Sequence, residues 1–459
     1  MKIILVATLI AFCSTALAQS PDESTIRQIY NKALAEGKSY EMLDYLCTKI
    51  GARLSGSPGA AAGVEWSRHT MEDFGFDSVW LQPVMVPHWV RGQKEIGRIL
   101  NSKKMGTVDV AICALGGSVG TGPEGISASI VEVKSFEELA SLGAKNVQGK
   151  LVFFNRPMDP AQLQTFAAYG GAVNQRGGGA SEAAKFGAVG VIVRSMGVNV
   201  ETYPHTGGMR YADGIAKIPA MAISTKDANL LSRLLKEDKG ILFYMEAHCQ
   251  TLEDAPSFNV IGQINGSEYK DEIIAIGGHL DSWDLGQGAH DDGAGCVQSI
   301  EVLRIMKVMG YKPKRTIRAV MFMNEENGLR GGLMYAELAL KNNEKHLAGI
   351  ESDRGGFTPR GFTISSNPEA RKKIQSWKPL LEPYGLSDFS GEGGGADIGP
   401  LGKNAIALIG YLPDSQRYFN YHHTPEDTID KVDKRELELG SASMAALVYL
   451  LDKYGLSDK

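Results

Sequence analysis

Short apolar runs alternate with longer amphipathic segments through the second half of the chain. The apolar runs occupy residues 273–276, 316–323, 348–352 and 405–408, and a last helical pattern covers residues 433–454. A brief apolar run bounded by glycine or polar residues is typical of a strand that is buried on both faces. This alternation predicts an α/β fold in which helices cover both faces of a mostly parallel mixed sheet.

The opening segment has a mainly helical pattern. Ser20 and Glu23 have the spacing of a capping box, and apolar residues then recur at helical intervals. We expect further helices at residues 40–50 and 60–74. Residues 79–86 predict an edge strand, because the run contains a proline, which cannot donate a hydrogen bond to a neighbouring strand.

The pattern of apolar and polar residues changes in residues 101–245 relative to the segments on either side. Short apolar runs alternate with glycine-rich turns, and one helix is expected at residues 180–186. The predicted strands are residues 110–115, 130–133, 151–154, 189–193 and 220–223. We therefore predict a β-rich inserted domain, after which the main fold resumes beyond a connection at residues 255–257.

Residues 1–18 have the form of a secretory signal peptide. Lys2 precedes an apolar run, and small residues at Ala16 and Ala18 mark a cleavage site before Gln19. Because this run is too short to cross a bilayer, we expect export to the periplasm or the exterior, with no membrane anchor. Residues 19–100 and 246–459 would then form the main domain around the insertion.

The composition of the chain limits the classes of partner that it is expected to bind. The chain of 459 residues has a net charge of -5 and no basic cluster, so nucleic acid is not expected. A small molecule or peptide is the expected partner, and a homodimer is compatible with the sequence. Of the five cysteines, Cys13 lies in the predicted signal peptide, and the others show no Cys-x-x-Cys spacing. We expect these to be buried free thiols.

Residues that commonly bind metals follow the predicted strands of the main domain. His279 comes just after the run at residues 273–276, and Asp291 follows a glycine-rich loop. Glu326, Asp353 and His423 lie beyond later strands. The carboxyl ends of parallel strands meet at one edge of a sheet, where α/β proteins bind ligands. Zinc accepts imidazole and carboxylate ligands, and five of them suit two zinc ions that share one carboxylate.

Three sequence motifs of the chain indicate a family resemblance. His-Leu-Asp-Ser-Trp-Asp at residues 279–284, Gly-Gln-Gly-Ala-His-Asp-Asp at residues 286–292 and the Pro-His-Thr-Gly loop at residues 204–207 resemble the zinc-dependent exopeptidase clan. That clan includes bacterial leucyl aminopeptidases and glutamate carboxypeptidase II, and the likeness is strongest to its carboxypeptidase Q branch. Residues 101–245 are similar to a protease-associated domain.

The resemblance implies a role for each ligand. Asp291 would bridge two zinc ions. Glu326 and His423 would complete one site, and His279 and Asp353 the other.

It also implies roles for three neighbours of the ligands. The carboxylate of Asp281 would orient the His279 imidazole, and Glu325 would be the general base. The Asp291-Asp292 peptide bond would be cis.

The expected function is a secreted dizinc exopeptidase that hydrolyses dipeptides or short peptides, as in the carboxypeptidase Q branch. A zinc aminopeptidase is the main alternative, because the same centre serves both directions. Glutaminyl cyclase, with one zinc, and a non-catalytic receptor, with none, are less favoured because all five ligands are present.

Other polar residues have weaker interpretations. His422 is expected at the rim of the site and His290 in solvent, while Asp397 has no assigned role. A surface ion pair is favoured for Arg354 over contact with a substrate carboxylate. The inserted domain is expected to act as a lid, with Tyr203 and His205 lining a wall; a partner-binding or dimer-forming module is the alternative.

Overall fold

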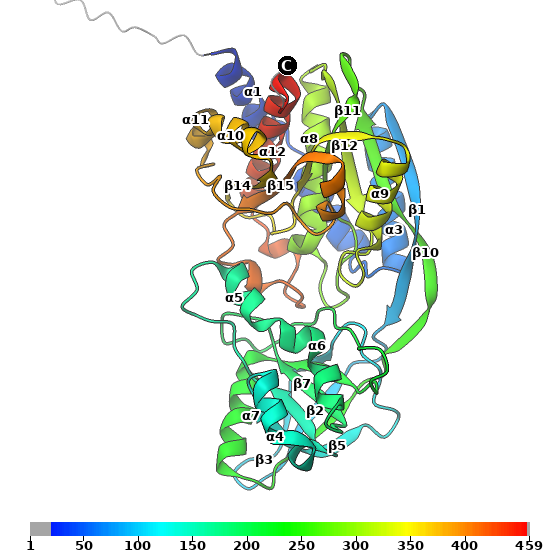
Figure 1. The fold of residues 1–459 in the computed structure, drawn as a ribbon, viewed down its shortest axis with the longest axis vertical. Coiled ribbons are helices and arrows are strands. Elements are labelled where there is room, and N and C mark those ends of the chain that lie inside the picture. Colours follow the sequence, from blue (N-terminus) through cyan, green and yellow to red (C-terminus); the bar gives the residue numbers. More distant parts are fainter. Residues whose placement is uncertain (1–19, 457–459) are drawn as a thin grey trace, which may run out of the picture.

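The computed structural model describes residues 20–456. It consists of two bodies, each built on its own sheet and stacked along the long axis of the molecule (Figure 1). The predicted signal peptide lies outside the described residues. No helix within the described range is long and apolar enough to cross a membrane. The four cysteines in this range are free and buried, as predicted.

The opening helices form as expected. Helix α1 (Pro21–Glu36) begins with the predicted capping box, in which the Ser20 hydroxyl accepts from the Glu23 N–H and the Glu23 carboxylate accepts from the Ser20 N–H. Helix α2 (Ser39–Tyr45) runs into a π-helical turn (Leu46–Ile50), and α3 (Pro58–Asp73) follows.

The main sheet has seven strands, and its order places β11 at the centre. In spatial order these are β1 (Ser78–Val90), β10 (Gln250–Ile264), β12 (Arg315–Phe322), β11 (Tyr269–His279), β13 (Lys345–Glu351), β15 (Ala405–Pro413) and β14 (Pro359–Ser366). The pairings among β12, β11, β13 and β15 are parallel, and the other three are antiparallel. The prediction of a mostly parallel sheet is therefore wrong, because antiparallel strands flank the parallel centre on both sides.

Helices cover both faces of this sheet, as predicted. Alternate residues of β12 point to opposite faces, so Ala319 and Met321 join the core under α8 (Ala294–Val308) and α12 (Lys434–Tyr454). Val320 and Phe322 pack instead with Tyr335 of α9 (Arg330–Lys341) on the other face. Two short helices, α10 (Pro368–Ser376) and α11 (Lys378–Leu381), follow β14.

The expected connection at residues 255–257 is wrong. These residues lie inside β10, which pairs with β1 along its length, with Pro256 opposite Met85. Only Val260 to Ile264 of β10 also pair with β12, so the segment around Pro256 has one strand neighbour and a missing N–H is tolerated there. β1 is an edge strand, as predicted. Together β1 and β10 extend from the main sheet toward the second body (Figure 1).

The second body, which we call the smaller domain, is built on an eight-stranded sheet formed by residues 96–246. Its strands in spatial order are β3 (Gly106–Val110), β2 (Ile96–Ser102), β9 (Leu242–Glu246), β5 (Ile126–Val133), β6 (Leu151–Phe154), β7 (Gly190–Arg194), β8 (Ala220–Ile223) and β4 (Ile112–Ala114). The run predicted as one strand at residues 110–115 divides between β3 and β4, at opposite edges of this sheet. Likeness to a protease-associated domain stays a prediction.

The smaller domain contains more helix than its sequence indicated. Its helices are α4 (Phe136–Val147), α5 (Thr165–Ala172), α6 (Asn174–Ala184) and α7 (Thr225–Glu237). Only α6 is predicted by the sequence, and it begins at Asn174, before the predicted start at residue 180. Its first half contains three glycines, which have low helix propensity and hide the helix in the sequence pattern. A Cβ at Gly179 would lie 2.9 Å from the Phe154 ring, so glycine allows α6 to approach β6 closely.

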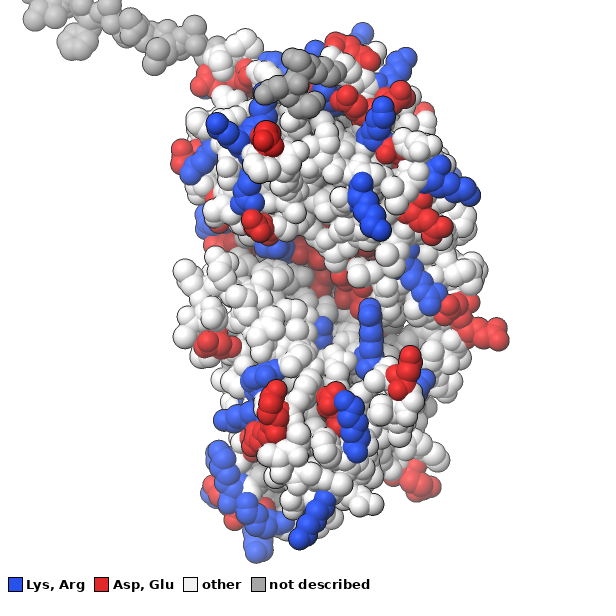
Figure 2. All heavy atoms as spheres, viewed as in Figure 1, with Lys and Arg blue, Asp and Glu red and all other residues white. Residues whose placement is uncertain are grey.

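The two bodies share a hydrophobic core. Phe357, Tyr418 and Phe419 of the main domain belong to the same buried cluster as Val152 and Phe154 of the smaller domain. This contact fixes the smaller domain against the ends of the main-sheet strands. The hollow between the two bodies is rich in acidic side chains (Figure 2).

Candidate active site

The carboxyl ends of the parallel strands bring the predicted ligands to one edge of the main sheet. His279 is the last residue of β11, Glu326 follows β12, and Asp353 follows β13. Asp291 precedes α8, and His423 lies in the loop between β15 and α12. All five predicted ligands converge, although they come from separate segments.

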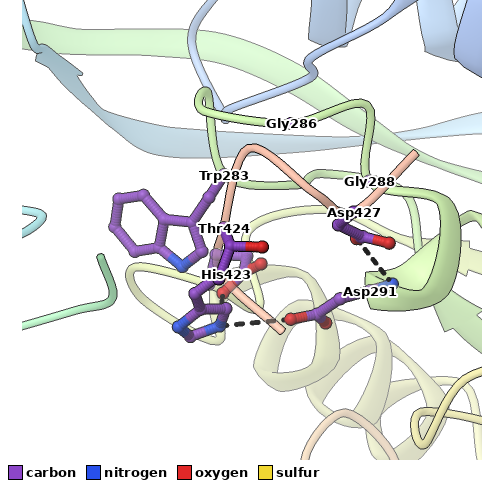
Figure 3. A pocket seen from close by; sticks show the side chains of 8 residues that line it. Trp283, Gly286, Gly288, Asp291, His423, Thr424 and Asp427 are labelled. Atoms are coloured by element: carbon purple, nitrogen blue, oxygen red, sulfur yellow. Dashed lines mark hydrogen bonds and ion pairs between the residues drawn. The ribbon is translucent and has the colours of Figure 1, made fainter. Parts of the chain in front are cut away.

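Asp291 lies between two histidines. Its Oδ1 is 3.2 Å from His279 Nε2, and its Oδ2 is 3.2 Å from His423 Nε2. His423 Nε2 is also 3.0 Å from Glu326 Oε2, and His279 Nε2 is 3.6 Å from Asp353 Oδ1. Figure 3 shows His423 and Asp291 pointing toward one another. One carboxylate thus faces two separate donor groups.

The cluster has the properties of a cation site. Asp291 Oδ2 and Glu326 Oε1 are buried and have no hydrogen-bond partner among residues 20–456. Buried carboxylates without donors are costly unless a cation compensates them. The ligand atoms of His279, Asp291 and Glu326 lie within 4.8 Å of one another, as do those of Asp291, His422 and His423.

Asp292 is also near His279, but both oxygens of its carboxylate accept hydrogen bonds from backbone N–H groups. Its Oδ2 accepts from the His279 N–H and its Oδ1 from the Gly295 N–H, each at 3.0 Å. Asp292 therefore fixes the backbone at the end of β11 and the start of α8. The Asp291-Asp292 peptide bond is cis, as predicted.

The pKa values of Glu325, Glu326 and His423 reflect their burial and the negative charges around them. Burial raises the pKa of Glu326 to about 7, and it raises the pKa of Glu325 well above the usual range. Burial alone would lower the pKa of His423, but the charges of Glu326 and Asp291 outweigh it and raise that pKa to about 10. The site therefore retains positive charge strongly.

Asp281 makes contacts other than those expected. Its carboxylate accepts hydrogen bonds from the backbone N–H groups of Asn324, Glu325 and Glu326. Its Oδ1 is 3.8 Å from His279 Nδ1, whereas its backbone carbonyl oxygen is 2.9 Å from that nitrogen. The carbonyl thus orients the imidazole, and the carboxylate holds the turn that carries both glutamates.

Arg53 holds the glycine-rich loop before Asp291. Its buried guanidinium donates to the carbonyl oxygens of Leu280, Gly51, Gln287 and Gly288 at 2.7–2.9 Å. Asp427 then accepts from the N–H groups of His290 and Asp291 (Figure 3). These contacts fix the approach of Asp291 to the site.

The histidines beside the ligands are more buried than expected. His290 is fully buried and stacks on Phe357 at 4.2 Å, so the prediction of a solvated side chain is wrong. His422 is buried and stacks on His423 with ring centroids 3.5 Å apart. His422 nevertheless borders the large cavity, as expected. The burial of His290 depends on Phe357, a distant residue whose contact is not visible in the local sequence.

A cavity of about 760 Å³ lies between the two bodies, next to the acidic cluster. The main domain contributes Asp291, Glu325, Glu326, Asp353, His422 and His423 to its wall. The smaller domain contributes Phe166, Tyr169, Arg176, Met209 and Arg210. A much smaller space, about 10 Å³, lies behind His423 between Trp283 and Asp427 (Figure 3).

Tyr203 and His205 are not on the wall of the large cavity. The Tyr203 hydroxyl donates to the Asn420 carbonyl, and His205 Nδ1 is 3.0 Å from the His422 carbonyl. His205 Nε2 is 2.8 Å from Glu201. The loop therefore braces the segment that carries His423, and its residues do not line the cavity as expected.

Two other polar residues have no defined role at the site. The buried carboxylate of Asp397 has no hydrogen-bond partner among the described residues, and burial raises its pKa well above the usual range. Arg354 stacks over Phe166 at 4.8 Å, and the described part of the chain offers it no carboxylate within ion-pair distance. The surface ion pair predicted for Arg354 is therefore absent there.

Known proteins share this arrangement of sequence and fold. The peptidase family M28 profile matches residues 259–448, a range that includes all five predicted ligands. Carboxypeptidase Q from Bos taurus and that from Homo sapiens are each 35% identical to this chain over 423 residues, which is 92% of this chain and 86% of the relative. The crystal structure of a peptidase M28 precursor from Shewanella amazonensis SB2B has 34% identity and a TM-score of 0.89, covering 95% of this chain and 98% of that one. With identity of this extent and a common fold, the chain belongs to peptidase family M28.

Proposed function

We propose that this protein is an exported dizinc exopeptidase that hydrolyses dipeptides and short peptides in the carboxypeptidase direction. The observation that carries the proposal is the position of Asp291, whose two oxygens face His279 and His423 at 3.2 Å each. A carboxylate between two imidazole groups is the arrangement that a bridging ligand requires. The names of the relatives support the direction of cleavage.

The remaining ligands divide between the two positions. Glu326 lies 3.0 Å from His423, and Asp353 lies 3.6 Å from His279, which supports one set on each side of Asp291. Two zinc ions held by these residues would acidify a water molecule and polarise the scissile carbonyl.

The residue that would move the proton is Glu325. It borders the large cavity and is partly exposed to it, whereas its neighbour Glu326 is buried against His423. Burial raises the pKa of Glu325, which makes its carboxylate a better proton acceptor. Glu325 would take a proton from water and pass it to the leaving amine.

A panel of free dipeptides and their blocked versions tests the direction. The proposal predicts that an N-acetylated dipeptide is still hydrolysed, while a C-terminal amide is hydrolysed poorly. The reverse pattern would identify an aminopeptidase, and equal rates on blocked interior bonds would exclude an exopeptidase.

A further inference from the structure

One arginine of the smaller domain borders the cavity without a carboxylate partner. Arg176, in α6, is 8% exposed and forms part of the cavity wall beside Tyr169 and His423. Two other buried arginines are paired with carboxylates, Arg91 with Glu95 and Asp284, and Arg304 with Glu301. Arg53 instead donates to four backbone carbonyl oxygens. Arg176 has no carboxylate within 4.0 Å among residues 20–456. Because the described residues give Arg176 neither a carboxylate nor the carbonyl acceptors that satisfy Arg53, its guanidinium is suited to bind an anion.

The contacts of Arg176 leave some N–H groups of its guanidinium without a hydrogen-bond acceptor. Its Nη2 donates to the Tyr169 hydroxyl at 2.6 Å, and its Cζ lies 5.4 Å from the centre of that ring. Its Nε is buried and has no hydrogen-bond partner in the described chain. Its Nη1 lies 3.4 Å from His423 Nδ1.

The tautomer of the His423 imidazole determines whether the contact between Arg176 Nη1 and His423 Nδ1 is a hydrogen bond. His423 Nε2 faces Asp291 and Glu326, so the proton of a neutral imidazole belongs on Nδ1. Nδ1 then donates to the Thr206 carbonyl, 3.3 Å away, and has no lone pair for Arg176. Nη1, Nε and the second N–H of Nη2 are therefore available to a ligand, and Nη2 shares an edge of the guanidinium with each of the other two nitrogens.

We propose that Arg176 binds the free C-terminal carboxylate of the peptide substrate. This inference rests on the proposed function and adds the residue that selects a free C-terminus. A planar guanidinium matches a carboxylate through two parallel hydrogen bonds, which neither Lys nor a neutral group reproduces.

The spacing suits a substrate with one residue beyond the scissile bond. Only the His423 ring separates Arg176 from the acidic cluster, because Nδ1 faces the guanidinium and Nε2 faces Asp291. One residue spans roughly 3.3–3.6 Å of chain, so its carboxylate reaches Arg176 while the scissile bond lies at the cluster.

Gly207 makes this close approach possible. A Cβ on Gly207 would lie 2.5 Å from Arg176 Cζ and 2.7 Å from His423 Nδ1. Its φ of +133° also disfavours other residues. The loop predicted to line a wall thus leaves room for the guanidinium beside the imidazole.

Calorimetric measurement of dipeptide binding to a variant with strongly reduced turnover tests the proposal. The parent carries Glu325→Gln, and the probes are L-Ala-L-Leu and its C-terminal amide. Adding Arg176→Gln should weaken binding of the free dipeptide about 10- to 100-fold and leave that of the amide within about twofold. Arg176→Lys should recover part of the preference for the acid. Arg156→Gln, a change outside the cavity wall in the same domain, should leave both affinities unchanged.

Equal losses for acid and amide would overturn the proposal, because they would show that Arg176 only supports the fold or His423. Failure of the parent to bind the free dipeptide, or to prefer it over the amide, would overturn it as well. If Arg176→Gln does not fold, Tyr169→Phe provides the second test, since loss of its hydroxyl should reduce the preference for the acid. Zinc content and wild-type turnover test the proposed function separately, because the binding contrast does not depend on turnover.

Discussion

The carboxylate of Asp281 accepts a 2.7 Å hydrogen bond from the backbone N–H of Asn324. This bond joins the end of β11 to the turn after β12, where Asn324 has a φ of +76°. The same carboxylate accepts from the next two N–H groups, so one buried side chain fixes the positions of Glu325 and Glu326.

Asp281→Ala should lower zinc affinity and turnover together, by about 10- to 100-fold, because the glutamate turn loses its acceptor. Zinc titration and dipeptide hydrolysis measure the two effects. Asp284→Ala is the control, since the nearby carboxylate of Asp284 pairs with Arg91 instead of with the glutamate turn. If Asp281→Ala kept normal zinc affinity, the carboxylate would not be what positions Glu326.

The two adjacent glutamates should have separable roles. Glu325→Gln should keep its metal and lose about 10²–10⁴-fold in turnover, because only proton transfer is removed. Glu326→Gln should lose metal affinity, because it removes a charged ligand. Metal analysis and kinetics on both variants provide matched controls for each other. Equal zinc loss in the two would contradict this division.

Arg53 should be important for folding. Arg53→Met removes the donors to four carbonyl oxygens and should lower the free energy of unfolding by roughly 2–4 kcal/mol. Arg330→Met, at an exposed ion pair with Asp254, should cost less than about 1 kcal/mol. Chemical denaturation measures both, and similar small losses would show that the loop does not depend on Arg53.

The loop at residues 203–207 should support catalysis without setting peptide length. His205→Ala should reduce hydrolysis of a dipeptide and of a longer peptide by the same factor, about 10-fold, because His205 braces the His422 carbonyl. Phe166→Ala changes a residue on the cavity wall and should alter the ratio of the two rates. A change in that ratio for His205→Ala would restore the original lid hypothesis for this loop.

The convergence of the site could be predicted because parallel strands deliver their following residues to one edge. The apolar run before His279 and the polar residues after β12 and β13 were enough to bring these side chains together. The antiparallel flanks could not be predicted in this way. Pro256 indicates a break in the local sequence, and only its pairing with Met85 on one side shows why the strand continues.

Contacts between distant segments explain the other features of the site that the sequence did not predict. The burial of His290 depends on Phe357 and Tyr421, which stack on it from elsewhere in the chain. Arg176 lies in a glycine-rich segment with no motif of its own, and its position is defined by His423 and Tyr169. The local sequence therefore gives no signal for the role of Arg176 or for the burial of His290.

Metal analysis of purified protein tests the central claim most directly. The account predicts two zinc ions per wild-type chain, and Asp291→Ala should lose tight binding at both positions because one carboxylate serves both. Chelation should abolish dipeptide hydrolysis, and added zinc should restore it. A wild-type chain with one zinc or none, or an Asp291→Ala variant that retains two tightly bound ions, would contradict the account.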